Sequence, residues 1–108
     1  MISVVVNDDY IKISGHSNPL SENHSLRCED VTCLCTTLRN YLYYKLDVNY
    51  CVLSKGLFYL PLKDIPDDYK NVIEMFMLGI QTLAVNFPDD ICVVNSTAHP
   101  SVEGINGN

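Results

Sequence analysis

Two stretches of this sequence carry apolar residues at helical spacing, and they constrain the fold more than any other feature. The first stripe comprises Val31, Leu34, Cys35, Leu38 and Leu42. The second comprises Tyr69, Val72, Ile73, Phe76, Ile80, Leu83, Ala84 and Phe87. Residues at positions i, i+3, i+4 and i+7 share one face of an α-helix, so each stripe predicts a helix with one buried face. We expect Asp30 to be the N-cap of the first helix, Pro66 to be the N1 residue of the second, and Pro88 to end it.

Short β-type segments lie on either side of both predicted helices. Residues 2–6 and 10–14 are apolar or alternate with period two around an Asn-Asp-Asp turn, which predicts a β-hairpin. Residues 48–53 and 57–62 predict a second strand pair around a turn, and residues 91–94 predict a last strand. The element order β-β-α-β-β-α-β favours an α+β fold, with one mostly antiparallel sheet and two helices packed on it.

The length and charge limit what such a chain does. Its 108 residues suffice for one domain, which we place at residues 1–95, followed by a flexible tail at 96–108 that is rich in Gly, Ser and Asn. Lys and Arg number 7 against 13 Asp and Glu, a net charge of −6 that disfavours direct binding of nucleic acid. A basic protein or peptide is the easier partner for such a chain.

The lack of a recognisable targeting signal and the number of cysteines predict the compartment in which the protein works. The N-terminus has no basic segment before its apolar run, and no stretch approaches the ~20 apolar residues that span a bilayer, so we expect a cytoplasmic protein without a membrane contact. Five cysteines are an odd number and too few for a disulfide scaffold, which favours free thiols in a reducing compartment. Cys35, Cys51 and Cys92 are expected in the core.

The candidate chemistry lies at the two ends of a loop predicted at residues 16–29. His16 follows Gly15 where the second strand ends, and Cys33 is the third residue of the first helix if Asp30 is its N-cap. A helix N-terminus stabilises a thiolate, but its ~0.3–1 kcal/mol is below the ~1.36 kcal/mol that one pKa unit requires. An imidazolium is therefore needed as well. Cys33 would be a nucleophile, His16 its proton acceptor and donor, and the first backbone N–H groups of the helix would hold an oxyanion. Alternatively, Cys33 is a small core residue and Gly15-His16 simply ends a strand.

These residues carry a resemblance. The run Ile13-Ser14-Gly15-His16, a loop, and then Asp30-Val31-Thr32-Cys33 resembles the signature of the ribosomal-processing cysteine protease (Prp) family. The similarity continues through Phe76-x-x-Gly79-Ile80-x-x-Leu83-Ala84 and Phe87-Pro88-Asp89 into the closing strand, and it covers roughly residues 2 to 94 with the same element order.

The resemblance implies an endopeptidase that uses no cofactor. Cys33 would be the nucleophile, His16 its dyad partner, and Asp30 an acidic residue that orients the site. Thr37 matches a position where the family often has Ser. The implied substrate is the N-terminal extension of a large-subunit ribosomal protein, or a capsid or scaffold protein for phage members. The implied assembly is a homodimer, and Tyr41, Tyr43 and Tyr44 would cover its interface, line a substrate groove, or form an exposed helix flank.

The sequence departs from the family pattern around the nucleophile. Sixteen residues separate His16 from Cys33, more than is usual, and this loop has Pro19 and no glycine after Gly15. Leu34 and Cys35 replace the family's small residues. A longer loop would change which peptides are admitted, and it motivates an alternative: a non-catalytic protein-binding module on the same fold.

A zinc site is a further alternative. His24, Cys28, Cys33 and Cys35 are possible ligands, but their spacing matches no usual zinc motif. In a helix, Cys33 and Cys35 would lie about 200° apart and could not converge on one metal ion. We therefore expect neither a metal nor a cofactor.

Overall fold

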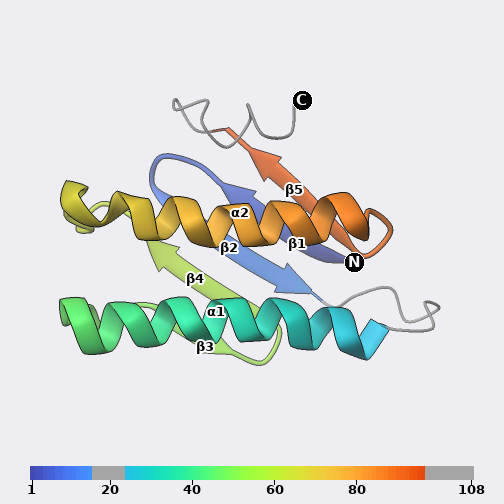
Figure 1. Ribbon diagram of the computed structural model, residues 1–108, viewed down its shortest axis with the longest axis horizontal. Helices are drawn as coiled ribbons and strands as arrows, with labels where there is room; N and C mark the ends of the chain where they lie inside the picture. Colours follow the sequence, from blue (N-terminus) through green and yellow to red (C-terminus); the bar gives the residue numbers. More distant parts are fainter. Residues whose placement is uncertain (16–23, 97–108) are drawn as a thin grey trace.

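The computed structural model describes residues 1–15 and 24–96, and it shows one sheet and two long helices (Figure 1). The elements, in chain order, are β1 (Ile2–Val6), β2 (Tyr10–Gly15), α1 (His24–Leu46), β3 (Val52–Ser54), β4 (Leu57–Pro61), the 3₁₀ turn η1 (Asp67–Tyr69), α2 (Lys70–Asn86) and β5 (Ile91–Asn95). The predicted α+β class and the order β-β-α-β-β-α-β are confirmed. The described helices include none that is long and apolar enough to span a membrane.

The five strands form one sheet in the order β3-β4-β2-β1-β5. Neighbouring strands are antiparallel except for β1 and β5, which run parallel with Val4 opposite Val93. The turn between β1 and β2 is held by Asn7, whose Oδ1 accepts hydrogen bonds from the backbone N–H groups of Asp9 and Tyr10, both at 2.9 Å. An Asx turn of this kind explains why the Asn-Asp-Asp run begins a hairpin.

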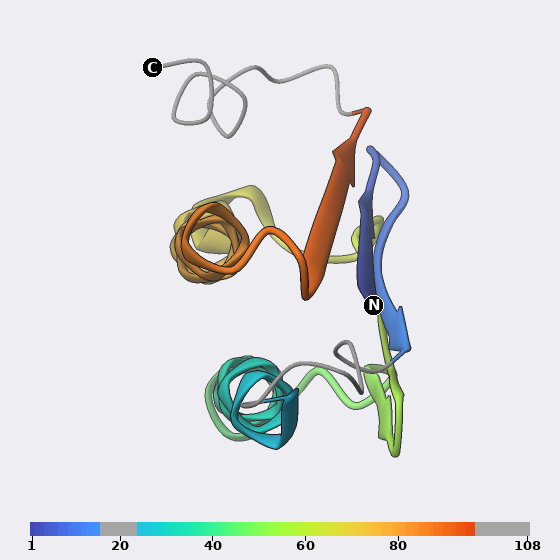
Figure 2. The same ribbon diagram turned by 90° about the vertical axis from the view of Figure 1, so that its right-hand side faces the viewer.

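Both helices lie on the same face of the sheet and run in opposite directions (Figures 1 and 2). The sheet therefore has one covered face and one open face, which accounts for the alternating burial along β1 and β2. A Cβ atom at Gly79 of α2 would lie 3.2 Å from both methyl groups of Leu34 of α1. The absence of a side chain at Gly79 thus allows the two helices to approach closely.

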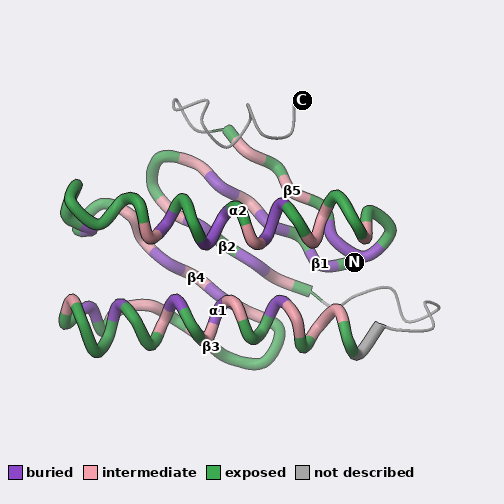
Figure 3. The backbone as a smooth tube through the Cα atoms, viewed as in Figure 1, coloured by how far each residue is buried: buried purple, intermediate pink, exposed green. Residues whose placement is uncertain are grey.

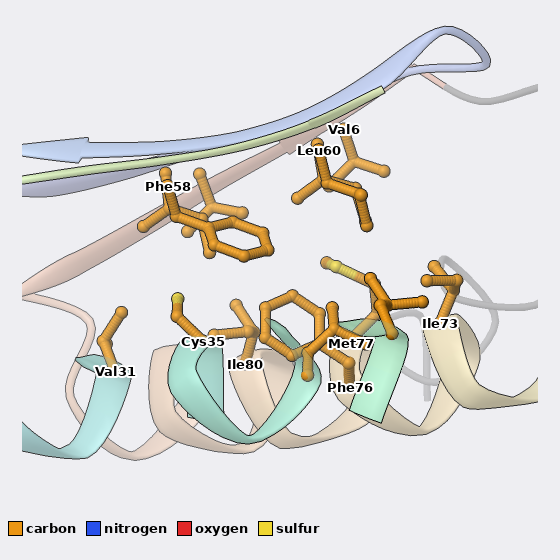
Figure 4. Packing of buried hydrophobic residues seen from close by; sticks show 14 of the residues in the cluster. Val6, Val31, Cys35, Phe58, Leu60, Ile73, Phe76, Met77 and Ile80 are labelled. Carbon is orange, nitrogen blue, oxygen red and sulfur yellow. The ribbon is translucent and has the colours of Figure 1, made fainter. Parts of the chain in front are cut away.

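The core lies between the sheet and this helix pair, and Figure 3 shows buried segments in both helices and in the strands. Phe58 of β4 points from the sheet toward the helices, and its ring centroid is 5.6 Å from that of Phe76 of α2 (Figure 4). Cys35 of α1 and Ile80 of α2 are buried in the same layer. The two apolar stripes seen in the sequence are therefore the inner faces of α1 and α2.

Three sequence predictions about element ends were wrong. The helix α1 begins at His24, six residues before Asp30, so Asp30 is not an N-cap and residues 24–29 do not belong to a loop. Pro66 is the N-cap of η1 and not the first residue of α2, which starts at Lys70. The strand predicted at 48–53 is formed only by Val52–Ser54. At Pro66 a 3₁₀ turn forms because the backbone N–H of Tyr69 donates to the carbonyl oxygen of Pro66 at 3.0 Å, and β3 is short because only Val52–Ser54 pair with β4.

Candidate active site

The thiol of Cys33 lies on the outer face of α1. Cys33 is the tenth residue of that helix and is exposed, whereas Val31 and Cys35 on either side of it are buried. The prediction that Cys33 is the third residue of its helix is therefore wrong, because α1 extends further toward the N-terminus. The dipole of a helix acts mainly within its first turn, so it contributes little at this position.

Thr37 lies one turn after Cys33 on the same exposed side of the helix. Its Oγ1 donates a hydrogen bond to the backbone carbonyl oxygen of Cys33 at 2.8 Å. This is the usual i to i−4 bond of a threonine inside a helix, and it leaves the thiol of Cys33 accessible.

Asp30 is engaged with a residue that the sequence pattern did not single out. The Oδ2 atom of Asp30 lies 2.8 Å from Nη1 of Arg27 in an i, i+3 ion pair along α1. The guanidinium carbon of Arg27 lies 3.5 Å from the ring centroid of Phe87, just after α2, in a cation–π contact. Asp30 thus orients Arg27, and together these residues connect the beginning of α1 to the end of α2.

His16, the other half of the predicted dyad, lies outside the described residues, as do residues 97–108 of the predicted tail. The preceding residue, Gly15, is described, and its backbone N–H donates to the carbonyl oxygen of Gly56 at 3.1 Å. Gly15 has a φ of 96°, and a Cβ atom there would lie 2.5 Å from the carbonyl oxygen of Met1. Only glycine fits at this position, which ends β2 and determines where the chain leaves the sheet.

A cavity of about 380 Å³ lies next to Gly15, between the end of β2, the first turns of α1 and the β3–β4 turn. We call it the β2-end cavity. Its walls are mainly apolar side chains and include Ile2, Ile13, Val31, Leu53, Leu57 and Phe58. Among the described residues that line it, Lys55 is the only one with a full charge. A cavity of this size and character accommodates a large apolar side chain of a peptide.

Two cysteines line the β2-end cavity, and neither is Cys33. Cys28 and Cys35 lie seven residues apart on the inner face of α1, and the exposed residue Thr32 also lines the cavity. The buried environment raises the pKa of the Cys35 thiol to about 12, with a further contribution from nearby Cys51, so Cys35 is a neutral core thiol. Cys28 was not among the residues predicted for a catalytic site. The signal was available, because Cys28 precedes Val31 by three residues and so extends the first apolar stripe backward.

The remaining cysteines, Cys51 and Cys92, differ in burial. Cys51 is half-buried against the core, as predicted, and burial raises the pKa of its thiol to about 11. Cys92 was predicted in the core, but it is exposed because it alternates with buried Ile91 along β5. Among residues 1–15 and 24–96, the structure contains no group of three His, Cys, Asp or Glu residues able to hold a metal ion. Cys33 and Cys35 are both within α1, on its outer and inner faces respectively.

The architecture is similar to that of a ribosomal processing protease. Two solved structures of the essential ribosomal processing protease Prp from S. aureus match it. One contains a covalently linked product peptide (TM-score 0.65) and the other a substrate peptide (TM-score 0.66), and each is 13% identical over 88% of this chain and 97% of that one. SMU.848 from Streptococcus mutans matches with a TM-score of 0.67 and 22% identity, over 89% of this chain and 92% of that one.

The similarity is one of fold. No family model matches the sequence. A search of curated proteins likewise finds no match.

Proposed function

We propose that this protein is a cysteine endopeptidase of the Prp-like kind, with Cys33 as nucleophile and His16 as the group that accepts and donates its proton. The main support is the fold shared with a protease whose solved structures hold a substrate peptide and a covalently linked product peptide. The exposed position of Cys33 is compatible with attack on a peptide carbonyl. His16 would then protonate the leaving amine, and water would release the acyl group.

The proposed substrate is the N-terminal extension of a large-subunit ribosomal protein, or a phage capsid or scaffold protein. The apolar walls of the β2-end cavity favour an extended peptide that inserts one apolar side chain beside Gly15. Asp30 would contribute through Arg27, its partner in the structure, and Thr37 by fixing the helix turn that carries Cys33. We expect the enzyme to act in the cytoplasm.

A second nucleophile is favoured by one observation. Cys28 lines the β2-end cavity together with Gly15, the residue immediately before His16, whereas Cys33 lies on the opposite side of α1. If the chain beyond Gly15 brings the imidazole back over the cavity, then Cys28 is the nearer thiol. The same observation motivates the non-catalytic alternative, in which the cavity binds a peptide and no thiol reacts.

The decisive experiment incubates the purified protein with precursor ribosomal protein and, separately, with phage capsid protein, and follows cleavage by mass spectrometry. Cys33→Ser and His16→Ala should abolish cleavage, while Cys28→Ser should retain it. Cys92→Ser is the matched control, since Cys92 is also an exposed thiol but lies on β5. Loss of cleavage in Cys28→Ser but not in Cys33→Ser would transfer the role to Cys28. Binding without cleavage by the wild-type protein would support the binding module instead.

The proposed assembly is a homodimer. Tyr41, Tyr43 and Tyr44 are exposed near the C-terminal end of α1, and the rings of Tyr43 and Tyr44 form an edge-to-face pair with centroids 5.0 Å apart. Exposed tyrosines of this kind are enriched at interfaces. Analytical ultracentrifugation should give about twice the mass of one chain, and Tyr44→Glu should shift the protein toward the monomer. A wild-type monomer at all concentrations would reject the dimer.

A further inference from the structure

The first six residues of α1, at 24–29, form an extension that has little local support as a helix. The first turn of α1 contains no acidic residue, although a carboxylate there would complement the positive end of the helix dipole. Arg27 instead places a cation close to that end, and Leu26 leaves 47% of its surface exposed. This part of the helix therefore depends on contacts with the rest of the molecule.

Those contacts converge on Arg27. Its guanidinium lies over the ring of Phe87, 3.5 Å from the centroid, and its Nη1 is 2.8 Å from Asp30 Oδ2. Phe87 is itself fixed, because it caps α2 and its backbone N–H donates to the carbonyl oxygen of Leu83 at 2.8 Å. Figure 1 shows that the start of α1 and the end of α2 lie at the same end of the molecule. Arg27 thus joins the extension to a rigid point on the second helix.

Asp30 has two mutually exclusive uses. In the structure, its carboxylate holds Arg27. In a helix that began at Asp30, the same carboxylate would accept the N–H groups of Thr32 or Cys33 as an N-cap. The N–H groups of residues 31–33 would then be the first of the helix and would have no intrahelical acceptor, so those that Asp30 does not accept would be available to an oxyanion. In the long helix, these groups lie in its interior and bond to carbonyl oxygens one turn earlier.

We propose that Arg27 is a positioning residue that determines where α1 begins, and thereby whether Cys33 lies in the helix interior or in its first turn. The catalytic consequence rests on the proposed function. With Arg27 on Phe87, the helix is long, and Cys28 forms part of the wall of the β2-end cavity. When Arg27 leaves Phe87, residues 24–29 unwind, Cys28 withdraws from that wall, and Cys33 becomes the third residue of a helix capped by Asp30. The cavity then opens toward the end of β2, where a peptide would enter.

The test uses Cys28 and Cys35 as a matched pair, since both line the cavity from the same face of α1. Arg27→Met keeps the length of the side chain but removes the charge. We expect alkylation of Cys28 by iodoacetamide, normalised to exposed Cys92, to rise about three- to tenfold, which corresponds to the loss of one cation–π contact. Amide hydrogen exchange across residues 26–29 should rise by a similar factor. Cys35 should stay unreactive, because it lies beyond the unwound segment.

Arg27→Lys provides the rescue, because lysine preserves the charge that pairs with Asp30 and faces Phe87. Arg27→Lys should return the alkylation of Cys28 to near the wild-type value. Peptide turnover should be higher in Arg27→Met than in the wild-type protein or in Arg27→Lys. If labelling of Cys35 rises in parallel with labelling of Cys28, the Arg27→Met variant has lost global stability. The test is then repeated with Phe87→Leu, which removes the aromatic ring instead of the guanidinium. Unchanged Cys28 labelling in a folded Arg27→Met or Phe87→Leu variant would overturn the proposal, as would labelling of Cys28 and Cys35 that rises together in both.

The labelling and exchange measurements need no substrate, so they separate this proposal from the protease proposal. Raised Cys28 labelling with no cleavage of any peptide would reject the enzyme and retain the helix switch. Raised Cys28 labelling with cleavage that is unchanged or slower in Arg27→Met would overturn the role of Arg27 in positioning Cys33 and leave the protease in place.

Discussion

Leu34 of α1 packs directly against Gly79 of α2: both methyl groups of Leu34 lie 3.2 Å from where a Cβ atom at Gly79 would be. Gly79→Ala adds one methyl group that Leu34 can accommodate by a small shift, and it recovers about 1 kcal/mol of helix propensity. The free energy of unfolding should therefore change by less than about 1 kcal/mol in urea denaturation.

Gly79→Leu should behave differently, because a branched side chain cannot fit against Leu34. Overpacking of this kind costs about 1–3 kcal/mol. A combined Leu34→Ala and Gly79→Leu variant should recover part of that loss, since the smaller residue at 34 makes room. If Gly79→Leu is as stable as the wild-type protein, the helices are not in close contact at this point.

Gly15 should tolerate no other residue. Its φ is 96°, and a Cβ atom added there would lie 2.5 Å from the backbone oxygen of Met1, so Gly15→Ala should lose more than about 2 kcal/mol of stability. Gly56→Ala is the matched control, because Gly56 also has a positive φ, of 76°. Chemical denaturation should show that the loss at Gly15 exceeds that at Gly56, and equal losses would mean that the contact with Met1 is unimportant.

The buried thiols predict a loss of stability in alkaline solution. The pKa of Cys35 is raised from 9.0 to about 12 and that of Cys51 from 9.0 to about 11, chiefly because burial disfavours the thiolate. The unfolded chain therefore loses these protons at lower pH than the folded one. The stabilising contribution is complete below about pH 9 and decreases as the pH rises toward 11–12, by about 1.4 kcal/mol per pH unit for Cys35 and by less for half-buried Cys51, whose charge solvent partly screens.

Urea denaturation between pH 8 and pH 10.5 measures this effect, and a Cys35→Ala/Cys51→Ala variant provides the comparison. The variant starts at a lower stability because of lost packing, but its free energy of unfolding should fall less steeply above pH 9. Subtraction of the two curves removes the tyrosine and lysine titrations that they share. Parallel curves would show that neither thiol is protected from ionisation.

The tilted ring pair formed by Phe58 and Phe76 should dominate the core energetically. Phe58 is 2% exposed and its ring centroid is 5.6 Å from that of Phe76, so Phe58→Ala should cost about 3–5 kcal/mol. Tyr59→Ala is the control on the open face of the sheet, where Tyr59 contacts Tyr10 with centroids 5.4 Å apart, and it should cost about 1 kcal/mol. Equal losses in thermal or urea denaturation would contradict the assignment of the buried face.

Residue spacing predicted the fold well, because the decisive information is periodic and local. The stripe from Val31 to Leu42 identified the inner face of α1, and the alternation in residues 2–6 and 10–14 identified the hairpin that Asn7 closes. The start of α1 was mispredicted at Asp30: the helix begins at His24 and includes Arg27, which contacts Phe87, sixty residues away in the chain. Residue spacing near Arg27 does not predict a contact with a residue so far away in the sequence.

The candidate site, like the fold, could be predicted from the sequence only where the information is local. Cys33 falls outside the apolar stripe, which agrees with its exposure, but its place within α1 was mispredicted because the stripe was taken to begin at Val31 and not at Cys28. The β2-end cavity requires the end of β2, the beginning of α1 and the β3–β4 turn to meet, which only the tertiary structure brings about. The relation of His16 to either thiol remains a prediction.

The parallel pairing of β5 with β1 has a consequence for how the protein is made. During translation, β1 receives its second neighbour only when Ile91–Asn95 has been synthesised, near the end of the described chain. Until then, the hydrogen-bonding edge of β1 is bare and a ready template for pairing with other nascent chains. Truncation before Ile91 should therefore yield an aggregating product, and acquisition of the native state should follow the emergence of β5 from the ribosome.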